Sequence, residues 1–165
     1  MVAARQRLER AGIRACYFLQ FGYPGETWRD IELTVSLVRR TRPYDIGVSV
    51  SYPLPNTVFY QKVQAELGSK RNWTDSDDLC VMFTAEYQDV FYHAIRDALH
   101  AEVDSWRNSA LRAQLPGLWR RVRELEPASR NACPTRLRTA REECTNDHHS
   151  QFLPVYQIAA AVGEA

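Results

Sequence analysis

The stretch IRACYFLQFGYPGET, residues 13–27, decides the fold, because a short apolar run gives way within five residues to the start of an amphipathic helix. Its first part, Ile13 to Phe21, is rich in aromatic and branched side chains and is ended by Gly22. A near-continuous apolar run of this length is typical of a strand covered on both faces, as in a parallel sheet. We therefore predict a buried parallel strand here.

A helix is expected directly after this strand. Thr27 can cap its amino terminus, and Asp30, three residues on, can act as the acidic partner of a capping box. The helix should end at about Arg42, because Pro43 disfavours helical backbone in the residue before it. Helical spacing then predicts one buried stripe, formed by Trp28, Ile31, Val35 and Val38.

A second strand is predicted from Ile46 to Tyr52, where large and small residues alternate. The large residues should pack on helices, and the small polar set should face a cavity or a closely approaching strand. The proline-stiffened loop SYPLPNT, residues 51–57, precedes a short helix that should end near Leu67. The order strand, helix, strand, helix predicts an α/β fold with a right-handed parallel layer.

The length of 165 residues and the hydrophobic content of 45% allow one domain with a substantial core. We expect residues 1–108 to hold the strand–helix unit and a long helix from Glu86 to Arg107. Residues 109–126 should add one more helix, and residues 127–165 should form an irregular, mobile tail.

The charge balance argues against a polyanionic partner. Lys and Arg number 21 and Asp and Glu number 20, so neither nucleic acid nor a membrane surface is an expected partner. The longest apolar run is too short to span a bilayer, and no apolar signal core follows Met1. These features predict a soluble, cytoplasmic protein.

Candidate metal ligands have plainer explanations in every case. The four cysteines lie at unrelated spacings, and Cys16 is expected to be a small buried hydrophobe. The acidic run at residues 75–78 lacks the glycine of a calcium loop and suits a helix start or a solvated loop. Two histidine groups are better explained as surface residues or as part of the tail: His93 with His100, and Cys144 with His148 and His149. No metal site is predicted.

Two loops, GYPGE at residues 22–26 and SYPLPNT at residues 51–57, leave the carboxyl ends of the predicted strands. Parallel α/β folds bind their ligands at these ends. In the first loop, Gly22 and Gly25 permit close approach of a ligand to the backbone, and free N–H groups near Thr27 can meet an anion or a polar group. A tight loop of this kind is also a common structural connector. On physical grounds alone both interpretations stay open.

From Ile13 to about Val103 the chain resembles the second half of the catalytic barrel of radical S-adenosylmethionine enzymes. The resemblance is to the branch that carries a cobalamin-binding domain, which includes the anaerobic magnesium-protoporphyrin ester cyclase type. The matching pieces are FLQFGYPGET, LVRRTRPYDIG and VSVSYPLPNTVFY, in this order. The resemblance implies the carboxyl-terminal part of a partial TIM barrel. It also implies contacts to the adenosyl part of S-adenosylmethionine from two sets of residues: Gly22, Tyr23, Pro24, Gly25 and Glu26, and Ser51, Tyr52 and Pro53.

The chain departs from this family at its catalytic centre. These enzymes hold a [4Fe–4S] cluster with a Cys-x-x-x-Cys-x-x-Cys loop, and the sequence contains no such loop, nor room for a cobalamin domain. We therefore expect the carboxyl-terminal part of a split or truncated enzyme, with no catalytic residue of its own and no turnover alone. Its partner would be the cluster-bearing half, and its substrate is not indicated. The alternative is a non-catalytic remnant or interaction domain without a ligand.

Overall fold

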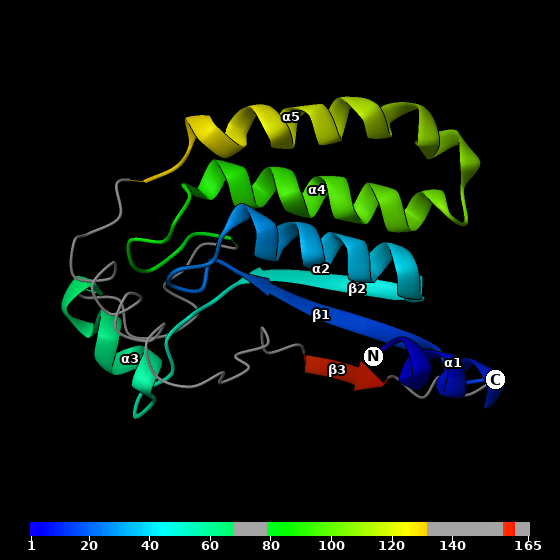
Figure 1. The fold of residues 1–165 in the computed structure, drawn as a ribbon, viewed down its shortest axis with the longest axis horizontal. Coiled ribbons are helices and arrows are strands. Elements are labelled where there is room, and N and C mark those ends of the chain that lie inside the picture. The colour runs from blue at the N-terminus through cyan, green and yellow to red at the C-terminus, as the bar shows by residue number, and fades with distance from the viewer. Residues whose placement is uncertain (68–78, 132–156, 161–165) are drawn as a thin grey trace.

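The computed structural model describes residues 1–67 and 79–131 and the backbone of residues 157–160. In chain order the elements are α1 (Val2–Arg10), β1 (Ala15–Phe21), α2 (Trp28–Thr41), β2 (Asp45–Val50), α3 (Val58–Val63), the 3₁₀ turn η1 (Gln64–Glu66), α4 (Asp89–Ser105), the 3₁₀ segment η3 (Ser109–Gln114), α5 (Leu115–Ala128) and β3 (Gln157–Ala160). Two strands alternate with helices and long helices follow, as predicted, so the fold is α/β (Figure 1).

The centre of the fold is the unit β1–α2–β2. β1 and β2 lie side by side and run parallel, with Cys16 opposite Asp45 and Phe21 opposite Val50. A parallel pair needs a crossover connection, and α2 supplies it. Both strands therefore end at the same edge of the sheet.

The ends of α2 follow the signals in the sequence. The Thr27 backbone N–H donates to Asp30 Oδ2 at 2.8 Å, and the Asp30 N–H donates to Thr27 Oγ1 at 3.4 Å, so the expected capping box is formed. At the other end Arg42 takes a left-handed conformation with φ of 45°, directly before Pro43. Both predicted ends of the helix are confirmed.

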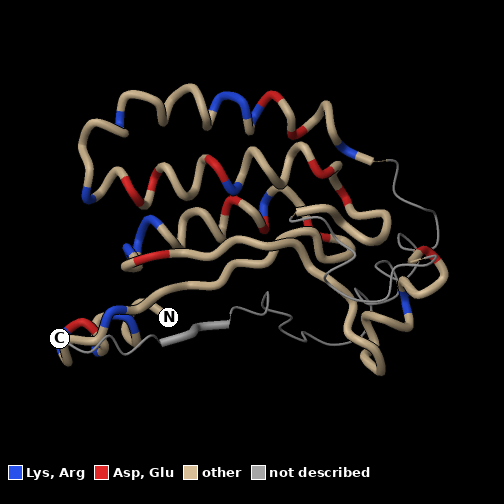
Figure 2. Tube along the Cα trace, turned by 180° about the vertical axis from the view of Figure 1, so that it is seen from behind, with Lys and Arg blue, Asp and Glu red and all other residues tan. Residues whose placement is uncertain are grey.

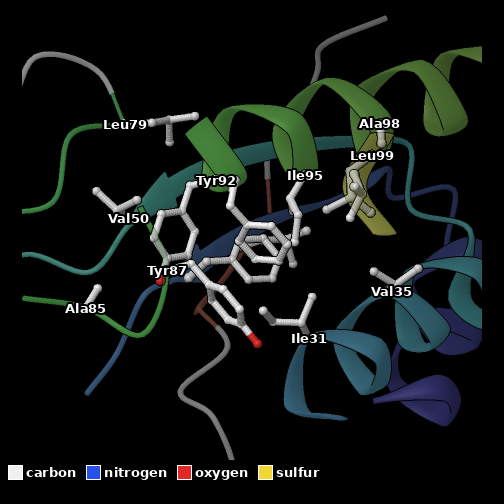
Figure 3. Packing of buried hydrophobic residues seen from close by; sticks show 14 of the residues in the cluster. Ile31, Val35, Val50, Leu79, Ala85, Tyr87, Tyr92, Ile95, Ala98 and Leu99 are labelled. Carbon is white, nitrogen blue, oxygen red and sulfur yellow. The ribbon is translucent and has the colours of Figure 1, made fainter. Parts of the chain in front are cut away.

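Helices α2 and α4 cover one face of the sheet, and α5 packs on α4 (Figure 1). The core lies between these helices and the sheet, and in Figure 3 the Tyr87 ring lies beside Ile31 of α2. Strand β1 contributes every second residue to this core: Ala15, Tyr17, Leu19 and Phe21. The alternation shows that these four residues face the helices, while Phe18 lies on the other face of β1.

Three predictions of burial need correction. Strand β1 is not covered on both faces: every second residue is buried, and Phe18 on the other face is 36% exposed. Trp28 is only half-buried at the first turn of α2. Cys16 is also half-buried rather than fully buried, since it points to the face of the sheet that α2 and α4 do not cover.

That second face carries the small residues of β2. Gly47 lies opposite Phe18 of β1, and a Cβ on Gly47 would meet the Phe18 ring at 3.0 Å. Ser49 lies opposite Gln20. The small residues therefore accommodate a large neighbour on β1, which agrees with the expectation of a closely approaching strand.

The carboxyl-terminal part contains more regular structure than expected. Helix α5 continues to Ala128, two residues beyond the predicted end of the last helix. The backbone of β3 pairs antiparallel with β1, with Ala160 opposite Ala15, and completes a sheet in the order β2–β1–β3. A strand at residues 157–160 was not predicted.

A polar network ties the three long helices together. Arg39 of α2 donates from Nε to Glu102 Oε1 at 2.6 Å and from Nη2 to Glu102 Oε2 at 2.8 Å. Trp119 of α5 donates from Nε1 to the same Glu102 Oε2 at 2.7 Å. The Arg39 guanidinium also lies 4.8 Å from the centre of a Trp119 ring. Glu102 of α4 is thus a shared acceptor that fixes α2 and α5 relative to α4.

Candidate functional site

The structure brings the two special loops together at the carboxyl edge of the sheet. We call residues 22–26 the first loop and residues 51–57 the second loop. The backbone N–H of Ser51 donates to the carbonyl oxygen of Phe21 at 2.7 Å, so the two loops start from a shared hydrogen bond. Beyond it, the Tyr23 ring of the first loop lies 4.9 Å from the Phe59 ring of α3. The first loop therefore lies beside the start of the second loop and contacts the helix that follows it.

The first loop is a type II turn. The N–H of Glu26 donates to the carbonyl oxygen of Tyr23 at 2.9 Å, which closes four residues. Pro24 occupies the second position, where its fixed φ fits, and Gly25 occupies the third with φ of +84°. A positive φ at this position is the reason that the turn needs a glycine.

The Glu26 side chain folds back and closes the loop a second time. Its Oε2 accepts a hydrogen bond of 2.8 Å from the backbone N–H of Gly22, whose φ is +80°. Burial raises the pKa of the Glu26 carboxyl to about 8, and the negative charge of Asp30 adds to this effect, while the bond from Gly22 acts against it. Glu26 is therefore mostly protonated at neutral pH.

The Tyr92 side chain of α4 packs against the first loop at Gly22. A Cβ on Gly22 would lie 3.3 Å from both Cζ and Oη of Tyr92, so the glycine permits this close approach. Tyr92 is 1% exposed. Its hydroxyl makes no hydrogen bond of ordinary geometry within residues 1–67 and 79–131, although the Tyr87 backbone lies near enough to lower its pKa. Burial, followed by the charge of Glu26, raises the pKa of Tyr92 far above the usual range.

Sequence reasoning missed Tyr92. The residue stands on α4, and nothing in its neighbours along the chain shows that its hydroxyl lies against Gly22. The aromatic cluster around it includes Phe91 and Tyr87, with the ring centres of Tyr92 and Phe91 5.7 Å apart (Figure 3). The Tyr92 hydroxyl is buried without a hydrogen bond of ordinary geometry to the described residues, and it lies against the Gly22 backbone, where a Cβ would crowd it. A buried polar group of this kind marks Tyr92 as a candidate functional residue.

The Thr27 N–H itself is not free at the start of α2. It is bonded to Asp30 Oδ2, and the Thr27 hydroxyl donates to the same oxygen at 2.5 Å. Asp30 thus engages both polar groups of Thr27 in the capping box.

The eight predicted site residues differ in their access to a ligand. Tyr23 and Gly25 are exposed, and Pro24 and Glu26 are half-buried. In the second loop Ser51 and Pro53 are buried and Tyr52 is half-buried. The loop ends where the Thr57 hydroxyl accepts the N–H of Tyr60 at 3.1 Å and caps α3. Tyr23 and Gly25 are therefore the most accessible of the eight residues, and Pro24, Glu26 and Tyr52 are partly accessible.

Metal ligation finds no support in the part of the chain that the structure describes. No group of three or more His, Cys, Asp or Glu side chains within it could hold a metal ion. His93 is half-buried, with Nδ1 2.9 Å from the carbonyl oxygen of Asp89. The acidic run at residues 75–78 and the group of Cys144, His148 and His149 lie outside the described residues.

Comparisons of the chain with family models, with curated proteins and with solved structures found no match. Within the described residues, none of the helices is long and apolar enough to cross a bilayer.

Proposed function

We propose that the chain supplies the adenosyl-binding side of an S-adenosylmethionine site, in the manner of the carboxyl-terminal half of a radical S-adenosylmethionine barrel. The observation that carries this proposal is the junction of the two loops at the carboxyl edge of adjacent parallel strands, through the hydrogen bond from Ser51 to Phe21. Ligands of parallel α/β sheets collect at this edge. The loops are also the two segments that resemble the family.

The chemistry of the loops suits an adenosyl group. Rings of Tyr23 and Tyr52 offer flat apolar contacts to an adenine, and the backbone of the second loop offers polar contacts at its edge. Glu26 has a second carboxyl oxygen for a ribose hydroxyl, because the bond from Gly22 uses Oε2.

The residues fit the adenosyl end of the ligand and do not fit the iron–sulfur cluster. The cluster supplies the electron that drives chemistry in such enzymes, and the Cys-x-x-x-Cys-x-x-Cys loop that would hold it is not in this sequence. In this proposal the residues of the chain bind and orient the adenosyl group. A cluster-bearing chain would be needed as partner, and the described chain alone has no turnover.

Calorimetric titration of the purified chain with S-adenosylmethionine and S-adenosylhomocysteine tests the proposal. Both ligands share the adenosyl end, so both should bind. Ser51→Trp should abolish binding by filling the junction, whereas Leu54→Trp, on a side chain that is 55% exposed in the same loop, should leave it unchanged. Tyr23→Ala removes an exposed ring without disturbing the core and should weaken binding as well. Absence of binding by either ligand at millimolar concentration would reject the proposal.

One observation favours a second candidate, a domain that retains the fold without a small-molecule role. The first loop satisfies its own polar groups, because the Gly22 N–H is bonded to Glu26 and the Glu26 N–H to Tyr23. A closed turn of this kind can serve as a connector alone. A neighbouring reading frame that carries the cysteine loop would favour the first candidate, and its absence would favour the second.

A further inference from the structure

A basic cavity opens at the opposite edge of the sheet from the two loops. Its volume is about 350 Å³, and the segments that directly precede β1 and β2 form part of its wall. Four arginines line it, from α1, from the start of β1, from the end of α2 and from the segment after α4: Arg5, Arg14, Arg42 and Arg107. We call this cavity the arginine pocket. In Figure 2, basic segments from these parts of the chain gather at one end of the molecule.

Arg5 is the most deeply placed of the four. Only 12% of its side chain is exposed, and its Nη2 donates to the carbonyl oxygen of Arg42 at 3.2 Å. Its Nη1 lies 3.3 Å from Glu9 Oε2, but neither Nη1 nor Nε makes a hydrogen bond of ordinary geometry with the described residues, and both atoms are shielded from solvent. A buried charge is costly unless it is paired. The Arg5 guanidinium therefore contributes positive charge to the pocket wall, and an anion in the pocket would offset part of this cost.

Aromatic rings hold the other three guanidinium groups in place. Arg14 and Arg107 lie 4.6 Å and 4.9 Å from the centre of the Tyr44 ring, and Arg42 lies 5.6 Å from that of Trp106. Arg14 also donates from Nη1 to the Tyr44 hydroxyl at 3.2 Å. Stacking on rings orients a guanidinium before a ligand arrives, so less entropy is lost on binding.

The pocket has an excess of positive charge. Glu9 is the only carboxylate in its described wall, and Asp104 lies beside it, paired with Arg107 at 3.2 Å. Four guanidinium groups against these two carboxylates leave two positive charges. Asp45 follows Tyr44 but does not line the pocket, and its Oδ1 accepts the N–H of Ile46. Since arginine stays protonated at all physiological pH values, this excess is permanent.

We propose that the arginine pocket binds a small phosphate monoester. Such a group carries nearly two negative charges at neutral pH, which matches the excess, and its oxygens fit the paired N–H groups of guanidinium. The volume lies at the lower end of the range for small-molecule sites. This inference is independent of the proposed function, because the pocket shares no residue with the two loops.

The test is calorimetric titration of the full chain with inorganic phosphate and with phenyl phosphate. Both probes should bind, and tighter binding of phenyl phosphate would show that Tyr44 or Trp106 also contacts the organic group. Arg42→Gln should weaken binding about tenfold, the usual loss for a charged hydrogen bond. Arg40→Gln is the matched control, because Arg40 is exposed on the last turn of α2 and does not line the pocket.

Two results would overturn the proposal. One is the absence of binding by either probe at about 10 mM, where even a weak site should begin to fill. The other is an equal loss of affinity in Arg40→Gln, which would indicate a general effect of charge rather than a site. Circular dichroism should show that each variant is folded, and Arg14→Gln replaces Arg42→Gln if the latter unfolds.

Discussion

Gly22→Ala should destabilise the chain far more than Gly25→Ala, although both glycines belong to the first loop. Both have positive φ, +80° at Gly22 and +84° at Gly25, so both variants carry the strain of a left-handed residue. They differ in their surroundings. A Cβ at Gly22 would lie 3.3 Å from Tyr92 Cζ and Oη, whereas a Cβ at Gly25 meets nothing within 4 Å.

The expected magnitudes follow from these contacts. The left-handed backbone costs a non-glycine residue about 1–2 kcal/mol, and this is the whole expected loss at Gly25. Crowding of the buried Tyr92 ring adds about 1–3 kcal/mol at Gly22, as overpacking does in other cores. Since small domains unfold with only about 5–15 kcal/mol, the difference between the two variants is readily measured.

Urea denaturation followed by circular dichroism gives the free energy of unfolding of both variants and of the parent chain. We expect Gly22→Ala to lose about 1–3 kcal/mol more than Gly25→Ala. Equal losses in the two variants would refute the close approach of Gly22 and Tyr92 in the candidate site.

Three further predictions concern buried polar groups. Burial holds the pKa of Glu26 at about 8, above its value of 4.5 in the unfolded chain. The free energy of unfolding should therefore fall as pH rises from about 4.5 to 8, by at most about 1.4 kcal/mol per pH unit. Urea denaturation at several pH values should show a flatter dependence of this free energy on pH in Glu26→Gln than in the parent chain. Tyr92→Phe should raise the free energy of unfolding by about 1 kcal/mol, because it removes a buried hydroxyl that makes no hydrogen bond of ordinary geometry with the described residues. Glu102→Ala should lower the melting temperature and cost about 1–3 kcal/mol, because the bonds from Arg39 and Trp119 are lost together.

Each of these predictions has a control. A profile of Glu26→Gln as steep as that of the parent chain would show that another group causes the pH dependence. Loss of stability in Tyr92→Phe would show that its hydroxyl has a partner. Glu32→Ala removes an exposed carboxylate from α2 and should change stability by less than about 0.5 kcal/mol, so a similar loss in both glutamate variants would contradict the role of Glu102.

Local signals in the sequence were sufficient for the strand–helix–strand unit. Thr27 and Asp30 mark the start of α2 and Pro43 marks its end, because capping and proline geometry act between residues that are near in the chain. The alternation in the second strand likewise separates Ile46 and Val50, which are buried, from the opposite face.

Features that depend on distant parts of the chain were not predictable in this way. The hydroxyl of Tyr92 reaches Gly22 across 70 positions, and the arginine pocket joins Arg5 to Arg107. The sequence indicated that the first loop was special, but the bond between Glu26 and Gly22, which closes it, depends on the geometry of the turn. Tertiary packing determines such contacts, and periodicity carries no information about them.

The central claim, that the two loops form an adenosyl site, is tested most directly by nuclear magnetic resonance. Amide spectra of the isotope-labelled chain would be recorded as S-adenosylhomocysteine is added. The account predicts that the largest shifts occur at the backbone amides of Tyr23, Gly25 and Tyr52, with little change at Tyr44 in the arginine pocket. Unchanged amides in both loops at saturating ligand, or shifts confined to the arginine pocket, would contradict it.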